Sequence, residues 1–251
     1  MSVTDRDPPA TAAAPDFPPL MKGLAAGPAN PFAIACDQAR RGVDSGLVAW
    51  SVTETRARAA LVLAPEVALE PAMAAMIACA VGLQNALGVL APPESAVHLE
   101  WSGGIRLNGG HCGGLHVAAP LRDPAALPDW LVVGFELTLA LPPDWEPGET
   151  PDWTALDQEG CGAVEPIALI GAWARHSLIW LNELDSAAGR ARLYREWQGM
   201  AWNPDRPVSV PVGGAVLTGR FIGVDENFGL LVKTAEDETR LVPLSNLIEE
   251  D

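Results

Sequence analysis

Residues 97–120 constrain the fold more than any other stretch of the chain. Apolar residues alternate with polar ones from Val97 to Trp101, which is typical of a strand with one buried face. Asn108-Gly109 follows as a strong hairpin signal, because both residues accept the positive φ angles of a type I′ turn. Glycine pairs stand on both sides of this turn. We therefore predict a strand, a glycine kink, a second strand, a tight turn and a third strand.

The surrounding segments predict a mixture of helices and strands. Apolar residues at helical spacing predict a long, mostly buried helix from Pro71, which the first turn of a helix tolerates, to Gly88. Further helices are predicted over 31–45, 165–182 and 188–199, strands over 47–52, 58–64 and 130–141, and a loop over 142–153. Three tryptophans of the last two helices are expected to pack rather than to bind a ligand: Trp173, Trp180 and Trp197.

The two ends of the chain differ from its middle. After Pro207, short apolar runs separated by turn residues predict about five short strands, a pattern typical of a small barrel of the SH3-like kind. Residues 1–30 are rich in proline, alanine and aspartate without periodicity, which predicts an extended or disordered leader. The predicted plan is a leader (1–30), a large domain (31–205) and a small C-terminal domain (206–251).

The composition argues against several classes of function. The formal net charge of −16 repels nucleic acid and anionic membranes. We expect a cytoplasmic protein without a membrane span, because no run of ~20 apolar residues is uninterrupted and the N-terminus lacks a signal-peptide pattern. The four cysteines form no Cys-x-x-Cys pair, which argues against a zinc site or a disulfide framework and favours buried thiols.

The histidines and glycines of residues 97–120 allow more than one interpretation. His98, His111 and His116 are candidate metal ligands, but no acidic residue stands at a recognisable ligand spacing, and we favour surface or hydrogen-bonded histidines. The glycine pairs either cradle a phosphate or form kinks and a turn. The second interpretation is favoured because these glycines lie between predicted strands rather than before a helix. Cys112 is expected to be buried and unreactive.

The element order and the residues of this stretch resemble the biotin-protein ligases and the related lipoate-protein ligases. Those enzymes have a K-W-P-N-D strand end, where this chain has EWSGGI (100–105), and then a lysine and an A-G step, where it has GHCGGL (110–115). The strand LVVGFELTLAL is similar to the G-x-G-I-N strand of the family, and TALDQEGC to the segment before its last helices. The likeness covers residues 31–251. It implies an α+β fold, with a mixed sheet packed with helices and then an SH3-like barrel.

The chain departs from this family at the residues that carry the family's chemistry. His111 stands where the family has a lysine, Gly104 where it has an aspartate and Gly103 where it has an asparagine. The two lysines of the chain, Lys22 and Lys233, lie outside the predicted large domain. Adenylation needs cations against phosphates and developing charge. We therefore expect a degenerate active site that does not support ordinary ligase catalysis.

Two further departures concern the predicted ligand pocket. In the G-x-G-I-N strand, Glu136 and Thr138 replace the second glycine and the asparagine. The short segment SVTETRARAA stands for the arginine-rich adenylate loop of the family, and only Arg56 and Arg58 correspond to it. These arginines are either ordinary exposed strand residues or anion-binding groups. His111 is a candidate binding residue that can be protonated beside a carboxylate or phosphate.

The resemblance implies a set of ligand-binding residues and two main functions. The predicted ligand-binding residues are Arg56, Arg58, Trp101, Gly103, Gly104, His111, Gly113, Gly114 and Thr138, with no catalytic residue assigned and no metal expected. The first function is binding of a small carboxylic acid, an acyl-adenylate or a carrier domain without ligation. The alternative is a divergent biotin, lipoate or octanoyl ligase or acyltransferase that acts on a carrier-domain lysine. A pure protein-interaction role of the small barrel is a third possibility.

The same resemblance implies cofactors and partners. Biotin, lipoate or ATP with magnesium are the ligands of such enzymes, and a biotinyl or lipoyl carrier domain is their protein partner. A homodimer is common in the family. Nucleic acid and membranes are not expected partners, because of the negative charge.

Overall fold

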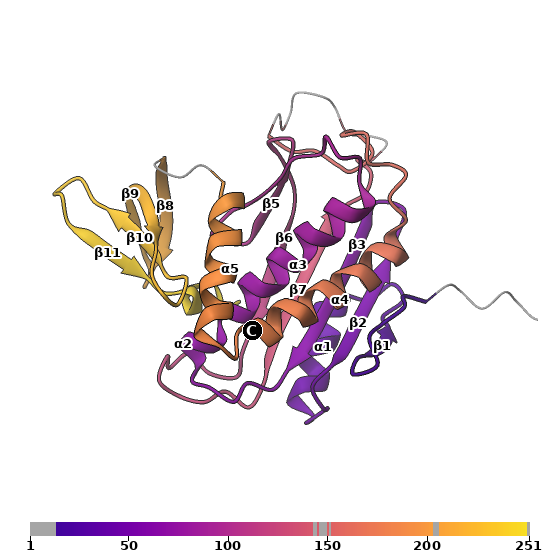
Figure 1. Ribbon diagram of the computed structural model, residues 1–251, viewed down its shortest axis with the longest axis horizontal. Helices are drawn as coiled ribbons and strands as arrows, with labels where there is room; N and C mark the ends of the chain where they lie inside the picture. Colours follow the sequence, from indigo (N-terminus) through magenta and orange to yellow (C-terminus); the bar gives the residue numbers. More distant parts are fainter. Residues whose placement is uncertain (1–13, 143–144, 146–149, 151, 203–205, 250–251) are drawn as a thin grey trace, which may run out of the picture.

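The computed structural model describes residues 14–142, 145, 150, 152–202 and 206–249. It contains a seven-stranded sheet with helices on both faces and a separate four-stranded sheet (Figure 1). The elements of the larger unit are β1 (Lys22–Ala25), α1 (Pro31–Arg40), β2 (Leu47–Val52), β3 (Arg56–Leu63), α2 (Leu69–Ala72), α3 (Ala74–Leu90), β4 (Val97–Leu99), β5 (Gly104–Leu107), β6 (Gly110–Ala118), β7 (Leu131–Thr138), α4 (Pro166–Glu183) and α5 (Ala187–Met200). The smaller unit contains β8 (Pro207–Val212), β9 (Ala215–Val224), β10 (Leu230–Lys233), β11 (Thr239–Val242) and the 3-10 helix η1 (Leu244–Leu247). The predicted α+β class is confirmed.

The large sheet has the strand order β1-β2-β3-β7-β6-β5-β4. β1 and β2 are parallel, and the other neighbouring strands are antiparallel. β7 lies near the middle of the sheet, and all but one of its residues are buried, which explains its almost continuous apolar sequence. The predicted turn at Asn108-Gly109 is confirmed, with φ angles of 50° and 95°. It connects β5 to β6 and fixes the register of this hairpin.

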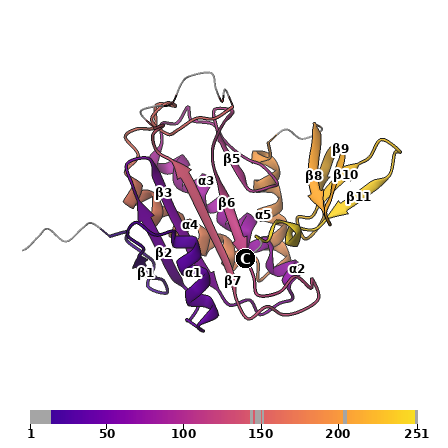
Figure 2. The same cartoon turned by 180° about the vertical axis from the view of Figure 1, so that it is seen from behind.

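The helices form one layer on each face of the large sheet. α3 and α4 cover one face (Figure 1), and α1 covers part of the other (Figure 2). α3 is apolar around most of its circumference because it packs between the sheet and α4. The segment Leu69–Leu90 is long and apolar enough to cross a membrane, with a mean hydropathy of 1.8 over 18 of its residues, but 72% of these 18 residues are buried inside the fold. Such a degree of burial is typical of a core helix in a folded domain.

Two helix starts follow from local sequence chemistry. α1 begins after Asn30, whose side chain accepts a hydrogen bond from the Phe32 backbone N–H at 2.9 Å. α4 begins after Glu165, which accepts from the Ile167 N–H at 3.0 Å. Each helix has a proline as its first residue, where no intrahelical N–H bond is lost.

The smaller unit is an antiparallel sheet in the order β11-β10-β9-β8. It therefore has four strands in the described part of the chain, one fewer than predicted. The buried indole of Trp101 connects it to the larger unit by donating to the Phe228 backbone oxygen at 2.8 Å. The predicted SH3-like barrel and the domain boundaries at 205 and 206 stay predictions.

The predicted leader is wrong for the part of it that is described. Lys22–Ala25 form β1, which pairs with β2 at the edge of the sheet. Met21 is 8% exposed and belongs to the main core. No periodicity is visible here because an edge strand of four residues is too short to show one. Residues 1–13 of the predicted leader lie outside the described residues.

Candidate functional site

The candidate site lies on the face of the large sheet that carries α1. This helix covers one end of the face, where Ala60, Val62 and Val132 form a small apolar cluster with it. Further along the same strands, α1 no longer covers the sheet and the side chains become charged or absent. The predicted ligand-binding residues concentrate on this open part.

Four residues form a row across four neighbouring strands of the open face. Arg58 of β3 pairs with Glu136 of β7, Glu136 with Gly114 of β6, and Gly114 with Gly104 of β5. Residues that face each other in register project from the same side of a sheet. The row therefore begins with two charged side chains and continues as backbone without side chains, half-buried at Gly114 and buried at Gly104.

Arg56 joins the two charged residues of the row, Arg58 and Glu136. These three side chains form the arginine–glutamate cluster. The Glu136 carboxylate accepts from Arg56 Nη1 with one oxygen and from Arg58 Nε with the other. The three side chains are 26% to 35% exposed, so the cluster is partly shielded from water. Both predicted anion-binding arginines thus have an internal carboxylate as their partner.

The glycines of residues 97–120 lie in different structural surroundings. Gly114 faces open space, because an added Cβ would have only the Gly103 oxygen within 4 Å, at 3.6 Å. At Gly113, an added Cβ would collide with the backbone oxygen of Glu136. Gly103 has a φ of +96°, a conformation that side chains rarely allow. The favoured interpretation of backbone kinks is confirmed for Gly103, and Gly113 is required by close strand approach.

His111 lies beside the row and is neutral near pH 7. Its ring makes an edge contact with Trp153, with ring centroids 4.5 Å apart. Partial burial lowers the pKa of His111, the Glu100 charge opposes this shift, and the Arg106 charge adds to it. Without a ligand the uncharged ring is therefore favoured, and protonation of His111 beside a bound carboxylate or phosphate stays a prediction. A neutral ring can exchange a hydrogen bond with a ligand but adds no positive charge.

A second ion pair, formed by Arg106 and Glu100, also lies beside His111. Arg106 Nε donates to Glu100, and Arg106 Nη1 donates to the Gly109 oxygen at 2.9 Å. The Arg106 guanidinium also lies over the ring of Trp202, 5.0 Å from its centroid. This arginine is thus held in place by three neighbours.

Thr138 and Cys112 lie at the margin of the site. Thr138 pairs with Arg56 across the sheet, and its buried hydroxyl has no hydrogen-bond partner among the described residues. Cys112 is buried, as expected, and burial raises the pKa of its thiol to about 12. A thiol with such a pKa is not a nucleophile at neutral pH.

Trp101 does not join the predicted site. It is 6% exposed, and its indole N–H is used by the bond to Phe228 in the smaller unit. Its contribution to ligand binding stays a prediction, whereas its contact between the two units is visible.

The three candidate metal-ligating histidines have separate surroundings. The ring of His98 meets Trp202, that of His111 meets Trp153, and His116 pairs with Glu249. Within the described ranges, no group of three or more histidine, cysteine, aspartate or glutamate residues is arranged to hold a metal ion.

A pocket of about 130 Å³ adjoins the arginine–glutamate cluster. It is lined by Asn30, Pro31, Phe32, Arg58, Ala59, His116, Phe135, Glu136 and Glu249. The site pocket, as we call it, therefore brings together the start of α1, three sheet strands and the end of the chain. Its volume is below the ~300 to 1,000 Å³ that is usual for ligand pockets.

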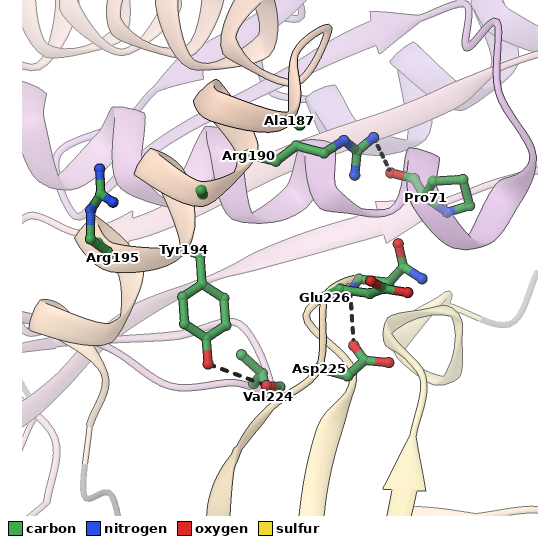
Figure 3. Close-up of a pocket in the computed structure, with 10 residues that line it drawn as sticks. Pro71, Ala187, Arg190, Tyr194, Arg195, Val224, Asp225 and Glu226 are labelled. Carbon is green, nitrogen blue, oxygen red and sulfur yellow. Dashed lines mark hydrogen bonds between the residues drawn. The ribbon is translucent and has the colours of Figure 1, made fainter.

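A larger cavity of about 870 Å³ lies between α5 and the turn that connects β9 to β10. Figure 3 shows Arg190 and Tyr194 of α5 on one side and Glu226 of the turn on the other. Tyr194 donates to the Val224 oxygen at 3.4 Å across this cavity. It contains none of the predicted site residues, so size alone does not identify the candidate site.

Sequence reasoning missed the central position of Glu136. The sequence identified Glu136 only as a replacement for a glycine of the family's strand. No local sequence pattern indicated that it lies between two arginines. One signal was available: Arg56 and Arg58 are two residues apart, so they share a face if the strand predicted from residue 58 begins two residues earlier, and they require a counter-charge if they are partly buried. Glu249 and His116 were not connected either, because they are 133 residues apart.

Comparison with known proteins gives a consistent result for the larger unit. A family model described as the biotin/lipoate A/B protein ligase family matches residues 17–199. A model described as a domain of unknown function matches residues 212–250. A biotin–[acetyl-CoA-carboxylase] ligase from Paracoccus denitrificans is 27% identical over 187 residues, which cover 73% of this chain and 76% of the ligase.

Solved structures show the same fold. A biotin protein ligase-like protein of unknown function from Silicibacter is 48% identical, with a TM-score of 0.86 over 94% of this chain and all of that one (100%). The biotin protein ligase from Aquifex aeolicus is 15% identical, with a TM-score of 0.68 over 90% of this chain and 96% of the enzyme. At this identity the second match concerns the fold alone.

Proposed function

Because this chain belongs to the biotin/lipoate A/B protein ligase family, we propose that it binds a small carboxylic acid, or the acyl-adenylate of such an acid, without performing ATP-dependent ligation. The ligand lies at the arginine–glutamate cluster and along the half-buried backbone of β6 at Gly114. The observation that carries the proposal is the Glu136 carboxylate, which engages both Arg56 and Arg58.

The charge of this cluster supports a ligand with one negative charge. Two guanidinium groups and one carboxylate have a formal net charge of about +1. A carboxylate or the phosphate of an acyl-adenylate carries one negative charge. The triphosphate of ATP carries several, and it would have to displace Glu136 to reach both arginines.

The residues present do not fit the magnesium and ATP that the family resemblance implied. Magnesium beside phosphates requires carboxylate oxygens that are free to coordinate it. Both oxygens of Glu136 accept from arginines, and Glu100 accepts from Arg106. In addition, the two lysines of the chain lie on β1 and β10, away from the row of site residues.

Thermal unfolding with candidate ligands tests this function. A ligand that binds the folded state raises the melting temperature. We expect a rise with an acyl-adenylate or a free acid among biotin, lipoate and octanoate, and none with ATP and magnesium alone. Release of pyrophosphate from ATP in the presence of an acid, or modification of an acceptor lysine with release of AMP, would overturn the proposal.

Removing the internal carboxylate provides a sharper test. Glu136→Gln keeps the shape but releases Arg56 and Arg58 for an external anion, so the affinity for ATP is expected to rise about tenfold, which corresponds to ~1.4 kcal/mol. Titration calorimetry measures the effect. Glu238→Gln is the matched control, because Glu238 pairs with Arg240 on the exposed surface and should leave affinity unchanged. Equal affinity in the wild type and in Glu136→Gln contradicts the assignment.

One comparison favours the alternative of a divergent ligase or acyltransferase, because the relative from Paracoccus denitrificans is named as a ligase. In that case, Arg56, Arg58, Arg106 and His111 would serve in place of the family lysine. Incubation with an acyl donor and a biotinyl or lipoyl carrier domain tests it, with intact mass as the readout. An unmodified acceptor beside a working positive control rules the alternative out. The cytoplasm is the proposed location for either function.

A further inference from the structure

The last described residues of the chain return to the large sheet beside the site pocket. Residues 244–249, the C-terminal segment, leave the small sheet after β11, and Ile248 is only 5% exposed. The Glu249 backbone N–H donates to the Val117 oxygen of β6 at 3.0 Å. Arg122 Nη2 donates to the backbone oxygens of Ile248 and Glu249 at 3.0 and 3.3 Å. The segment is therefore attached to the same strand that carries Gly114.

The side chain of Glu249 forms one wall of the site pocket. It pairs with His116 Nδ1, and both residues line the pocket together with Arg58 and Glu136. The pocket of about 130 Å³ has the volume of about four water molecules at ~30 Å³ each. Biotin, lipoate and their adenylates are larger than this, so such a ligand can extend from the arginine–glutamate cluster into the pocket only if the wall moves.

We infer that the C-terminal segment is a clasp over the site pocket, closed by the pair of Glu249 and His116 and opened when this pair is released. The inference rests on the proposed function, because it assigns a regulation to the same ligand site. Ile248 and Arg122 keep the segment close to β6. The partly exposed pair of Glu249 and His116 determines how often the side chain of Glu249 moves away from the pocket.

The charges around His116 give the clasp a pH dependence. Glu249 of the C-terminal segment faces the ring together with Glu136 of β7 and Arg58 of β3, and α1 contributes the uncharged ring of Phe32. The hydrogen bond to Glu249 raises the pKa of His116 above its ordinary value of 6.5, against the effect of burial. A raised folded-state pKa means that the pair stabilises the closed clasp fully below pH 6.5 and loses this effect as the pH rises through the raised value. The clasp is thus closed in mild acid and opens toward alkaline pH.

Hydrogen exchange of residues 244–249 tests the clasp without any ligand. After correction for intrinsic exchange, protection in the wild type should fall between pH 6 and pH 8. Glu249→Gln and His116→Gln should reduce protection at pH 6 by about threefold to tenfold, in the range of a partly exposed charged hydrogen bond. Glu238→Gln and His176→Gln are matched controls away from the segment. Equal protection in the wild type and in Glu249→Gln would overturn the inference.

Binding of a non-hydrolysable biotinyl-adenylate analogue separates the two proposals. The affinity of the wild type should increase from pH 6 to pH 8, and Glu249→Gln should bind more tightly at pH 6 and lose this increase. If the analogue binds but the two proteins have the same pH profile, the clasp is wrong and the proposed function stands. If this analogue and every other candidate acid and adenylate fail to bind either protein, the proposed function fails, and the exchange result alone decides whether the segment opens.

Discussion

At the residue scale, Glu136 has the largest effect on what the site can bind. Its position on β7 places a carboxylate between two arginines of β3, and hydrogen bonds to both of them hold it there. A chain with a formal net charge of −16 has few cations to offer an anionic ligand. The internal pairing reduces that supply further at the one place where the family resemblance predicted an anion site.

The adjacent glycines Gly113 and Gly114 lead to different predictions for the effect of alanine on stability. Gly113→Ala places a Cβ against the Glu136 backbone oxygen, so we expect the free energy of unfolding to fall by about 1 to 3 kcal/mol. Gly114→Ala adds a methyl group in open space and should change it by less than ~0.5 kcal/mol. Urea unfolding of both variants measures the difference. A Gly113→Ala protein as stable as Gly114→Ala would mean that β6 and β7 are farther apart than described.

At the scale of elements, α3 and α4 cross in close contact at Gly82. The backbone nitrogen of Ser177 lies 2.8 Å from where a Cβ of residue 82 would be, so only glycine allows this approach. The apolar pattern predicted α3 as a long buried helix, but it did not indicate which face would meet α4. That contact became visible only when the two helices, far apart in sequence, were placed together.

Alanine at two glycines of α3 tests this crossing. Gly82→Ala should lower the free energy of unfolding by about 1 to 3 kcal/mol, because the helices must separate. Gly88→Ala, with no atom within 4 Å of the added group, should raise it by about 0.5 to 1 kcal/mol through helix propensity. Thermal and urea unfolding measure whether each substitution lowers or raises the free energy of unfolding. Stabilisation by both substitutions would contradict the close crossing.

At the scale of the whole molecule, Trp101 and the C-terminal segment connect the small sheet to the large one. Trp101 donates to Phe228 from the β4–β5 connection, and residues 244–249 return to β6. The first connection contacts the turn between β9 and β10, in the middle of the small unit, and the second is the last described segment of that unit. The position of the small sheet beside the site thus depends on contacts that its own sequence does not contain.

Replacement of the indole tests the first connection. Trp101→Phe leaves the buried Phe228 oxygen without its donor, so we expect a loss of about 1 to 3 kcal/mol and faster hydrogen exchange in β8–β11. Trp180→Phe is the matched control, because its indole donates to Asn85 within the large unit. It should lower stability without a selective effect on the small sheet. Uniform exchange changes in both variants would contradict a bridging role for Trp101.

The sequence by itself determined the secondary structure and the fold class. The β5–β6 turn, the buried α3, the apolar β7 and the two final helices depend on local periodicity and on the conformations that Asn108 and Gly109 allow. Even the short β1 was missed for a local reason, since an edge strand of four residues has no clear pattern. The residues of the β5–β6 hairpin were located correctly because they lie within one continuous stretch.

Only the tertiary structure decided the chemistry of the site. Arg58 and Glu136 are 78 residues apart, and His116 and Glu249 are 133 residues apart, so no local pattern relates them. The strand order and register decide which of these side chains face each other, and a shift of one residue would turn Glu136 to the opposite face of the sheet. Register depends on the packing of all strands and helices together, which is why the paired arginines and the closed pocket could be seen only in the folded chain.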